Sequence, residues 1–133
     1  MYQWIHYFRS FYIFVRLIYH YENDSSAVLS YGSSADLAQS TAYQTIAGQI
    51  STANSKNASG SLYLFNPSST TFVKHFISNS NAGATDGGGD SRSLEYFVAG
   101  YGNTTSAINA IRFQMASGNI DAGTIKMYGI KGS

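Results

Sequence analysis

Short runs of alternating apolar and polar residues recur along the chain from Ser26 onward, and they predict β-strands. Each run is rich in β-branched or aromatic residues and is bounded by Gly, Asn, Ser or Pro, the residues that favour turns. The runs cover residues 27–32, 61–65, 70–77, 93–101, 107–115 and 123–130. In the third and fifth runs the period of two is clear, and it directs one set of side chains to a core and the other to water.

The last two runs predict a hairpin at the end of the chain. The segment "SGNIDAG" between them supplies Gly and Asn, which tolerate the positive φ angles of a tight connection. We therefore expect 107–115 and 123–130 to pair, with Ile111, Phe113, Ile125 and Met127 facing one core.

The regular spacing of these strands predicts an all-β fold made of packed antiparallel sheets, namely a jelly-roll-like or immunoglobulin-like β-sandwich. Residues 35–50 fit either a short helix or a strand at Ala42–Ile46, and the strand is the favoured alternative. The polar, Gly-rich stretches 51–60 and 79–92 are expected to be long loops.

The N-terminal residues 1–18 differ from the remainder, because they are crowded with aromatic side chains while 19–133 is small, polar and Gly-rich. We therefore divide the chain into an aromatic segment, 1–18, and a sandwich domain, 19–133. The segment fits strands at Tyr2–Phe8 and Phe11–Tyr19, or an amphipathic helix, because both of its faces are apolar. A third alternative is that it has no partner in the fold, as in a gene with a displaced start or a disruption.

The same segment is not expected to span a membrane. A spanning helix needs about 20 mostly apolar residues, whereas Arg9 and Arg16 interrupt this run and leave Phe11–Val15 as the uninterrupted piece. No small-residue cleavage site follows it, so a signal peptide is not expected either.

The amino-acid composition supports the all-β prediction and argues against nucleic acid as a binding partner. The 133 residues correspond to one domain, with 15% aromatic but only 11% charged residues. The net charge is +1 and the basic residues are scattered singly, so nucleic acid is not an expected partner. The absence of cysteine excludes disulfides and thiolate chemistry.

The sequence points to no enzyme, catalytic residue or cofactor. The three histidines are far apart, no nucleophile-elbow GxSxG is present, and Glu95 is the one acid inside a predicted strand. "DGGGD" places Asp86 and Asp90 on a carbonyl-rich loop that offers the oxygen ligands of Ca²⁺. Its spacing is not that of an EF-hand, so a solvated loop without metal is the favoured interpretation.

Tyrosines form the remaining candidate site. A sugar ring stacks its C–H face on an aromatic ring, and neighbouring amides bind its hydroxyl groups. The alternative, which we favour, is that these tyrosines cover the edge of the core with their hydroxyl groups in water. The candidate glycan platform consists of Tyr31, Tyr63, Tyr96, Tyr101 and Asn103, with Asn79 as an alternative amide.

Parts of the chain resemble uncharacterised C-terminal β-sandwich modules in structural and tail proteins of tailed bacteriophages, especially those of marine bacteria. The resemblance covers roughly Tyr19 to Lys131. Its most specific pieces are "LYLFNPSSTTFVKHF" at 62–76 and "AINAIRFQMASGNIDAGTIKMYGIK" at 107–131. Modules of that family usually begin with a strand pair and a long polar loop, and the sequence of residues 1–18 does not match this pattern.

The resemblance implies a virion surface component without catalytic function, such as a tail-fibre, baseplate or head-decoration domain. Its expected partners are other virion proteins, further copies of itself, including a homotrimer, and host-surface glycans. The resemblance assigns no ligand residues. Two other functions stay open at this point: a lectin-like carbohydrate-binding domain, and a truncated gene remnant with no function of its own.

Overall fold

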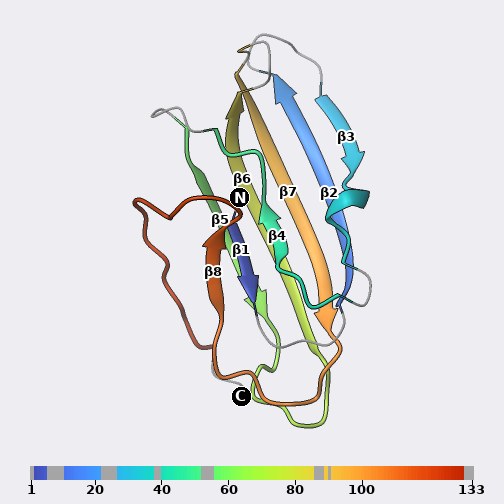
Figure 1. Cartoon of the computed structure of the whole chain (residues 1–133). Coiled ribbons are helices and arrows are strands. Elements are labelled where there is room, and N and C mark those ends of the chain that lie inside the picture. The colour runs from blue at the N-terminus through green and yellow to red at the C-terminus, as the bar shows by residue number, and fades with distance from the viewer. Residues whose placement is uncertain are drawn as a thin grey trace.

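The computed structural model describes residues 2–5, 11–21, 27–37, 40–51, 56–85, 89 and 91–130. Apart from one short 3-10 helix, η1 (Ser33–Ala35), their regular structure consists of β-strands in antiparallel sheets (Figure 1). The prediction of an all-β antiparallel fold is therefore confirmed, while the finer likeness to a jelly roll stays a prediction. None of the helices in these residues is long and apolar enough to cross a membrane.

The larger sheet has five strands and is built around two long neighbours, β6 (Lys74–Thr85) and β7 (Ser91–Gly102), which pair along their whole length. Every pair of neighbours in it is antiparallel. In spatial order the strands are β3 (Ala27–Tyr31), β2 (Phe11–Tyr21), β7 (Ser91–Gly102), β6 (Lys74–Thr85) and β5 (Ala58–Leu64).

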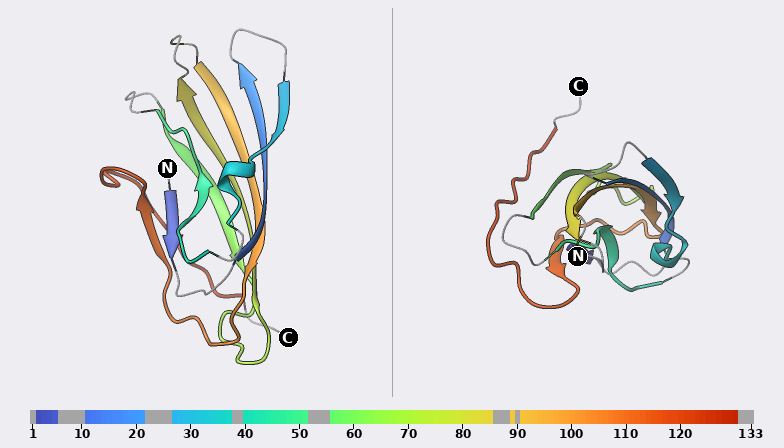
Figure 2. Two further views of the ribbon diagram at one scale, coloured as in Figure 1. Left: turned by 45° about the vertical axis from the view of Figure 1, so that its right-hand side comes forward. Right: turned by 90° about the horizontal axis from the view of Figure 1, so that it is seen from above.

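The smaller sheet has three strands in the order β4 (Gln44–Ala47), β1 (Tyr2–Ile5) and β8 (Arg112–Met115). It faces the concave side of the larger sheet (Figure 2). Of the alternatives for the aromatic N-terminal segment, the structure has strands. They hold interior positions, since β1 joins β4 to β8 and β2 joins β3 to β7.

The core lies between the two sheets. Ile46 of β4, Phe76 of β6 and Val98 of β7 form its first cluster, and a second cluster lies further along β6 and β7. Half-buried apolar residues pack around the first cluster. They are Ala35, Leu37, Leu62, Leu64, Ile108, Ile111 and Phe113.

Buried polar groups of the larger sheet are held by backbone carbonyl groups. The fully buried Lys74 donates from its ammonium group to the carbonyl oxygens of Phe72 at 2.6 Å and Thr105 at 3.4 Å. The hydroxyl of Ser80 on β6 donates to the carbonyl oxygen of Ile46 on β4 at 2.6 Å. These bonds offset the cost of burying a charge and a hydroxyl, and the second one joins the two sheets.

The expected loop at 79–92 is wrong for most of its length. β6 continues to Thr85 and β7 begins at Ser91. In this half of β6, small residues alternate between the interior and water, with Ser80, Ala82 and Ala84 buried. Small inward side chains leave room for the second sheet. The same small and polar residues give this half of β6 the amino-acid composition of a loop.

The predicted closing hairpin is also wrong. Strand β8 covers only Arg112–Met115, and 123–130 forms no strand. Ile111 and Phe113 are half-buried against the first core cluster, as predicted, whereas Ile125 and Met127 are exposed. The strand expected at Ala42–Ile46 is confirmed as β4, shifted by one or two residues.

Candidate functional site

Exposed apolar side chains gather on the face of the larger sheet that points away from the smaller sheet. The alternation that buries Phe76 turns its neighbours His75 and Ile77 outward, and both are exposed. Tyr63 on β5 pairs with Ile77 in the strand register, and its side chain is exposed on the same outer face. Directly paired residues of antiparallel strands have their side chains on one face, about 5 Å apart.

A second row of rings follows at the next outward position. The backbone N–H of Phe65 donates to the carbonyl oxygen of His75 at 2.9 Å, and His75 pairs with Tyr101 on β7. The rings of His75 and Tyr101 are in contact, with centroids 5.4 Å apart and planes at 44°. We call the combined surface, consisting of Tyr63, Phe65, His75, Ile77 and Tyr101, the outer aromatic patch.

Hydrogen-bonding side chains border this patch. Ser61 pairs with Asn79 one step further along β5 and β6, and both are exposed on the outer face. Asn103 is exposed just beyond the end of β7, two residues after Tyr101. The patch therefore combines ring faces with hydroxyl and amide groups on the rigid backbone of three paired strands.

Of the residues predicted for a glycan platform, the structure brings Tyr63, Tyr101 and Asn103 to one region and places Tyr31 elsewhere. Tyr31 ends β3, the opposite end strand from β5. Four strand spacings, about 19 Å in total, separate Tyr31 on β3 from Tyr63 on β5. The hydroxyl of Tyr31 donates to the Asp36 carboxylate, and this hydrogen bond, with partial desolvation and the carboxylate charge, raises the pKa of Tyr31 above its ordinary value.

Tyr96, the fourth predicted tyrosine, lies on the inner face of β7. It is only 4% exposed and belongs to the second core cluster with Ala84 and Leu94. A Cβ atom at Gly48 would lie 2.9 Å from the hydroxyl oxygen of Tyr96, so a larger residue at position 48 would displace this buried ring. Tyr96 is thus a core residue and contributes nothing to the outer face.

Sequence reasoning did not single out three members of the patch, Phe65, His75 and Ile77. The signal was present in the period of two at 70–77, which puts His75 and Ile77 on the face opposite to Phe76. The position of Phe65 follows only from the pairing of β5 with β6. The calcium candidates Asp86 and Asp90 lie outside the described residues.

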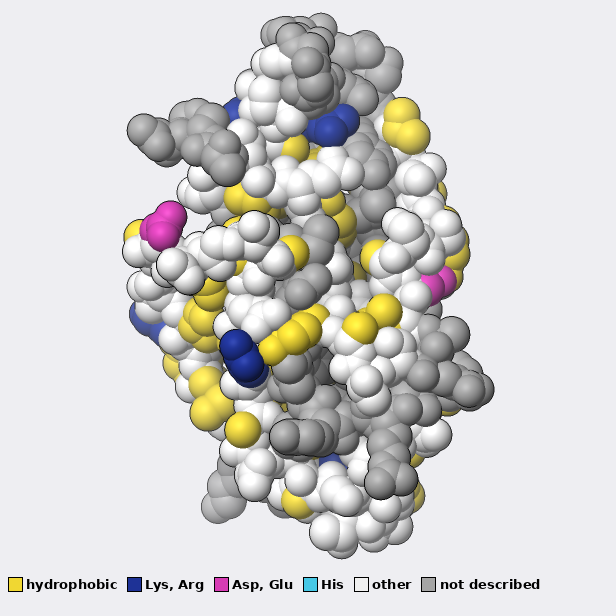
Figure 3. Space-filling model, viewed as in Figure 1, with side chains coloured by type: hydrophobic (Ala, Val, Ile, Leu, Met, Phe, Trp, Pro, Cys, Tyr) yellow, Lys and Arg dark blue, Asp and Glu magenta, His cyan; other side chains and the backbone are white. Residues whose placement is uncertain are grey.

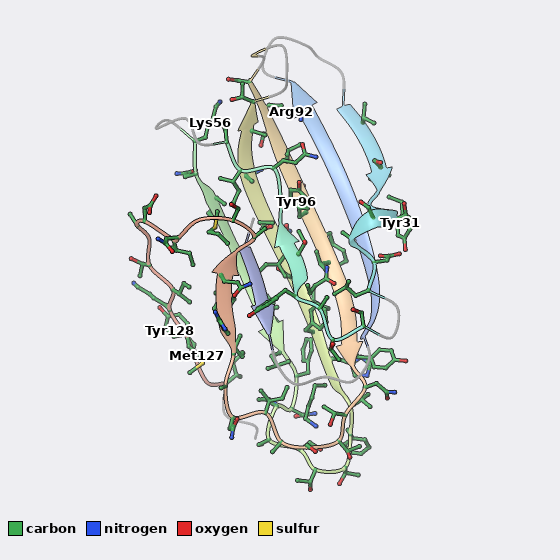
Figure 4. All side chains as sticks on the ribbon, viewed as in Figure 1. Tyr31, Lys56, Arg92, Tyr96, Met127 and Tyr128 are labelled. Atoms are coloured by element: carbon green, nitrogen blue, oxygen red, sulfur yellow. The ribbon has the colours of Figure 1, made fainter. Side chains whose placement is uncertain are left out.

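Charged side chains of the described residues are dispersed. Lys56 donates to the hydroxyl of Ser91 on β7 at 2.9 Å, and Arg92 of β7 donates to the side-chain oxygen of Gln49 at 2.8 Å, so these two hydrogen bonds join Lys56 and Gln49 to the larger sheet (Figure 4). On the face shown in Figure 3, basic and acidic side chains lie apart from one another. Within the described ranges, no three His, Asp or Glu side chains are grouped closely enough to hold a metal ion.

No protein-family model, curated protein or solved structure matches this chain. The likeness to phage modules therefore stays a prediction from the sequence, and the geometry of the chain carries the functional argument.

Proposed function

We propose that this protein is a non-enzymatic structural or adhesion module of a bacteriophage particle, and that its outer aromatic patch contacts a saccharide of the host surface. The observation that carries the adhesive role is the exposure of Tyr63, Phe65 and His75 together on one sheet face. Aromatic groups of this size are usually buried, and an exposed cluster of them marks an interaction surface.

The chemistry of the patch favours a saccharide over other ligands. The ring of Tyr63 and the tilted, contacting rings of His75 and Tyr101 offer apolar faces to the C–H groups of a sugar. The bordering side chains of Asn79 and Asn103 can donate to and accept from hydroxyl groups. A five-stranded sheet that contains two paired twelve-residue strands holds these groups in place before binding, which lowers the entropy cost of association.

Assignment to a virion is supported by the resemblance over Tyr19 to Lys131. The interior positions of β1 and β2 count against the gene-remnant alternative, because a foreign N-terminus would not be expected to supply the strand that joins β3 to β7.

The location in the particle is testable by mass spectrometry of purified phage that encodes this chain. Cleavage after Lys and Arg yields the peptides 75–92 and 113–126, which are long enough to identify it. We expect both peptides in purified particles, at a level comparable to known structural proteins. Their presence in infected-cell lysate but not in purified particles would contradict a virion role.

Replacing Tyr63 or Tyr101 by Ala is expected to weaken saccharide binding about tenfold, corresponding to about 1.4 kcal/mol for the loss of one stacking ring. The measurement is titration calorimetry with purified cell-envelope polysaccharide of the host. Tyr31→Ala is the matched control, because Tyr31 is an exposed tyrosine at the opposite edge of the same sheet.

Equal affinities for all three variants and the unmodified protein would show that the patch is not the binding surface. If the unmodified protein binds none of the polysaccharides, the adhesive role fails, while detection in particles would still support the structural one.

A further inference from the structure

The C-terminal residues 117–130, which we call the C-terminal arm, extend along the outside of the molecule (Figures 1 and 2). Every residue of the arm is exposed. Its large apolar side chains Ile125, Met127, Tyr128 and Ile130 are 61% to 90% exposed. A run of this kind is rare on the surface of a soluble monomer and marks a contact surface.

The arm has the sequence of a strand. In "GTIKMYGI", Ile125 and Met127 alternate with Lys126 and Tyr128, and the composition is β-branched and aromatic. Gly118 and Gly123 stand on either side of the turn at the start of the arm, before the strand-like residues 124–130, with φ angles of 75° and 146°, which other residues rarely adopt. The connection can therefore direct the arm away from its own body.

A matching acceptor lies at the side of the fold where β5 and β8 end their respective sheets. In Figures 1 and 2 these two strands lie on the same side of the molecule. Leu62 and Leu64 of β5, Phe113 of β8 and the preceding Ile111 pack against the first core cluster yet are only half-buried. A strand added beside β8 would extend the smaller sheet and cover them.

We propose that the C-terminal arm of one copy of this protein adds as a strand to the β8 edge of a second copy, whose own arm is donated in turn. Ile125 and Met127 then pack beside Ile111 and Phe113 of the neighbour.

Within one chain the apolar side chains of the arm remain exposed, and the core beside β8 is incompletely covered. Exchange between copies would bury both surfaces, because the strand-like arm would pair with β8 of the other copy. Exchange of an identical element is a low-cost route to symmetric oligomers.

Charge and size agree with a second copy as the partner. A net charge of +1 lets identical copies approach without strong repulsion. The eight residues 123–130 span about 27 Å when extended, which is longer than β8. Reciprocal donation buries two arms in each pair of copies. The buried area is therefore twice that of a single arm contact, and a larger buried area favours a stable interface.

The first test is the solution mass from light scattering across the micromolar range. The 133-residue chain has a mass of 14.4 kDa, and we expect it to have twice this mass or a higher whole multiple of it in solution. A variant ending at Ala116 and the variant Met127→Asp are expected to be monomeric, with circular dichroism unchanged. If the unmodified chain is monomeric, or if both variants keep the oligomer, the proposal is wrong.

The second test distinguishes exchange from a hairpin within one chain. Because the protein has no cysteine, single cysteines can be placed in the arm (Lys126→Cys) and in β8 (Gln114→Cys), each in a different chain. After the two proteins are mixed, a short thiol crosslinker is expected to join them into a covalent dimer of both variants.

Lys126→Cys mixed with Leu29→Cys is the control, because Leu29 is exposed on β3 at the far end strand. A chain carrying both Lys126→Cys and Gln114→Cys completes the set. If that double variant crosslinks only within itself, at monomer mass, and the mixture of single variants does not crosslink, the arm folds back on its own β8 and the proposal is wrong.

Discussion

Deletion of residues 1–18 is expected to abolish cooperative folding. The deletion removes β1 and most of β2, so β4 and β8 lose the strand between them, and β3 loses its connection to β7. A domain is stable by only about 5–15 kcal/mol, and the loss of one interior strand from each sheet exceeds this margin. The measurement is thermal unfolding followed by circular dichroism, with light scattering to detect aggregation of the exposed sheet edges.

Removal of the C-terminal arm is the matched control for this deletion. It removes a segment of similar length that contributes no strand, so its unfolding transition is expected to stay cooperative. If the protein lacking residues 1–18 instead unfolds cooperatively at an unchanged temperature, the aromatic segment is foreign to the fold. That result would support the gene-remnant alternative.

Phe76→Ala is expected to lower the free energy of unfolding by about 3–5 kcal/mol, because it empties the centre of the first core cluster. The corresponding fall in melting temperature is roughly 10 °C or more for a domain of this size. Phe72→Ala is the control: Phe72 is 65% exposed, against 1% for Phe76, and its loss is expected to change stability by less than about 0.5 kcal/mol. Chemical denaturation of both variants gives the two values.

Equal destabilisation by the two substitutions would contradict the placement of β6. It would mean that the inward set of side chains differs from the one described, which would also turn His75 and Ile77 away from the outer face. The comparison therefore tests the geometry of the outer aromatic patch without any ligand.

The outer aromatic patch and the C-terminal arm use different parts of the surface. The patch lies on β5, β6 and β7, whereas the proposed exchange occupies the edge of β8. An assembly joined through the arms would present one patch per copy. Several weak saccharide contacts would then act together, and the avidity would exceed the affinity of a single patch.

Two strand assignments illustrate where sequence reasoning worked. The runs at 27–32 and 93–101 became β3 and β7 within one or two residues. Their β-branched and aromatic residues favour extended backbone, and the flanking Gly, Asn and Ser residues favour turns. Both signals are local, so they could be read without knowledge of the partner strands.

The second half of β6 illustrates where such reasoning failed. The run "NSNAGAT" has the composition of a loop, yet it pairs with β7 along its whole length. Small residues fit there because the smaller sheet and the segment around Lys56 lie close, as the near approach of Lys56 to Gly83 shows. Strand propensity depends on such neighbours, and these neighbours are distant in sequence.

For the candidate site too, the sequence pattern determined some features and the strand pairing decided the others. The alternation around His75 determined which side chains of β6 leave the core. The pairing of β5, β6 and β7 decided that Tyr63 and Tyr101 share a face while Tyr96 is buried. Sequence alone determined the all-β class, several of the strands and the apolar pattern of the arm, because these follow from local propensity and a period of two.

Only the tertiary structure decided which tyrosines gather on one face, that the aromatic N-terminus supplies strands inside both sheets, and that the arm has no strand partner among the described residues of its own chain. Strand order and register depend on contacts between residues far apart along the chain, and the period of two is the same for every possible partner.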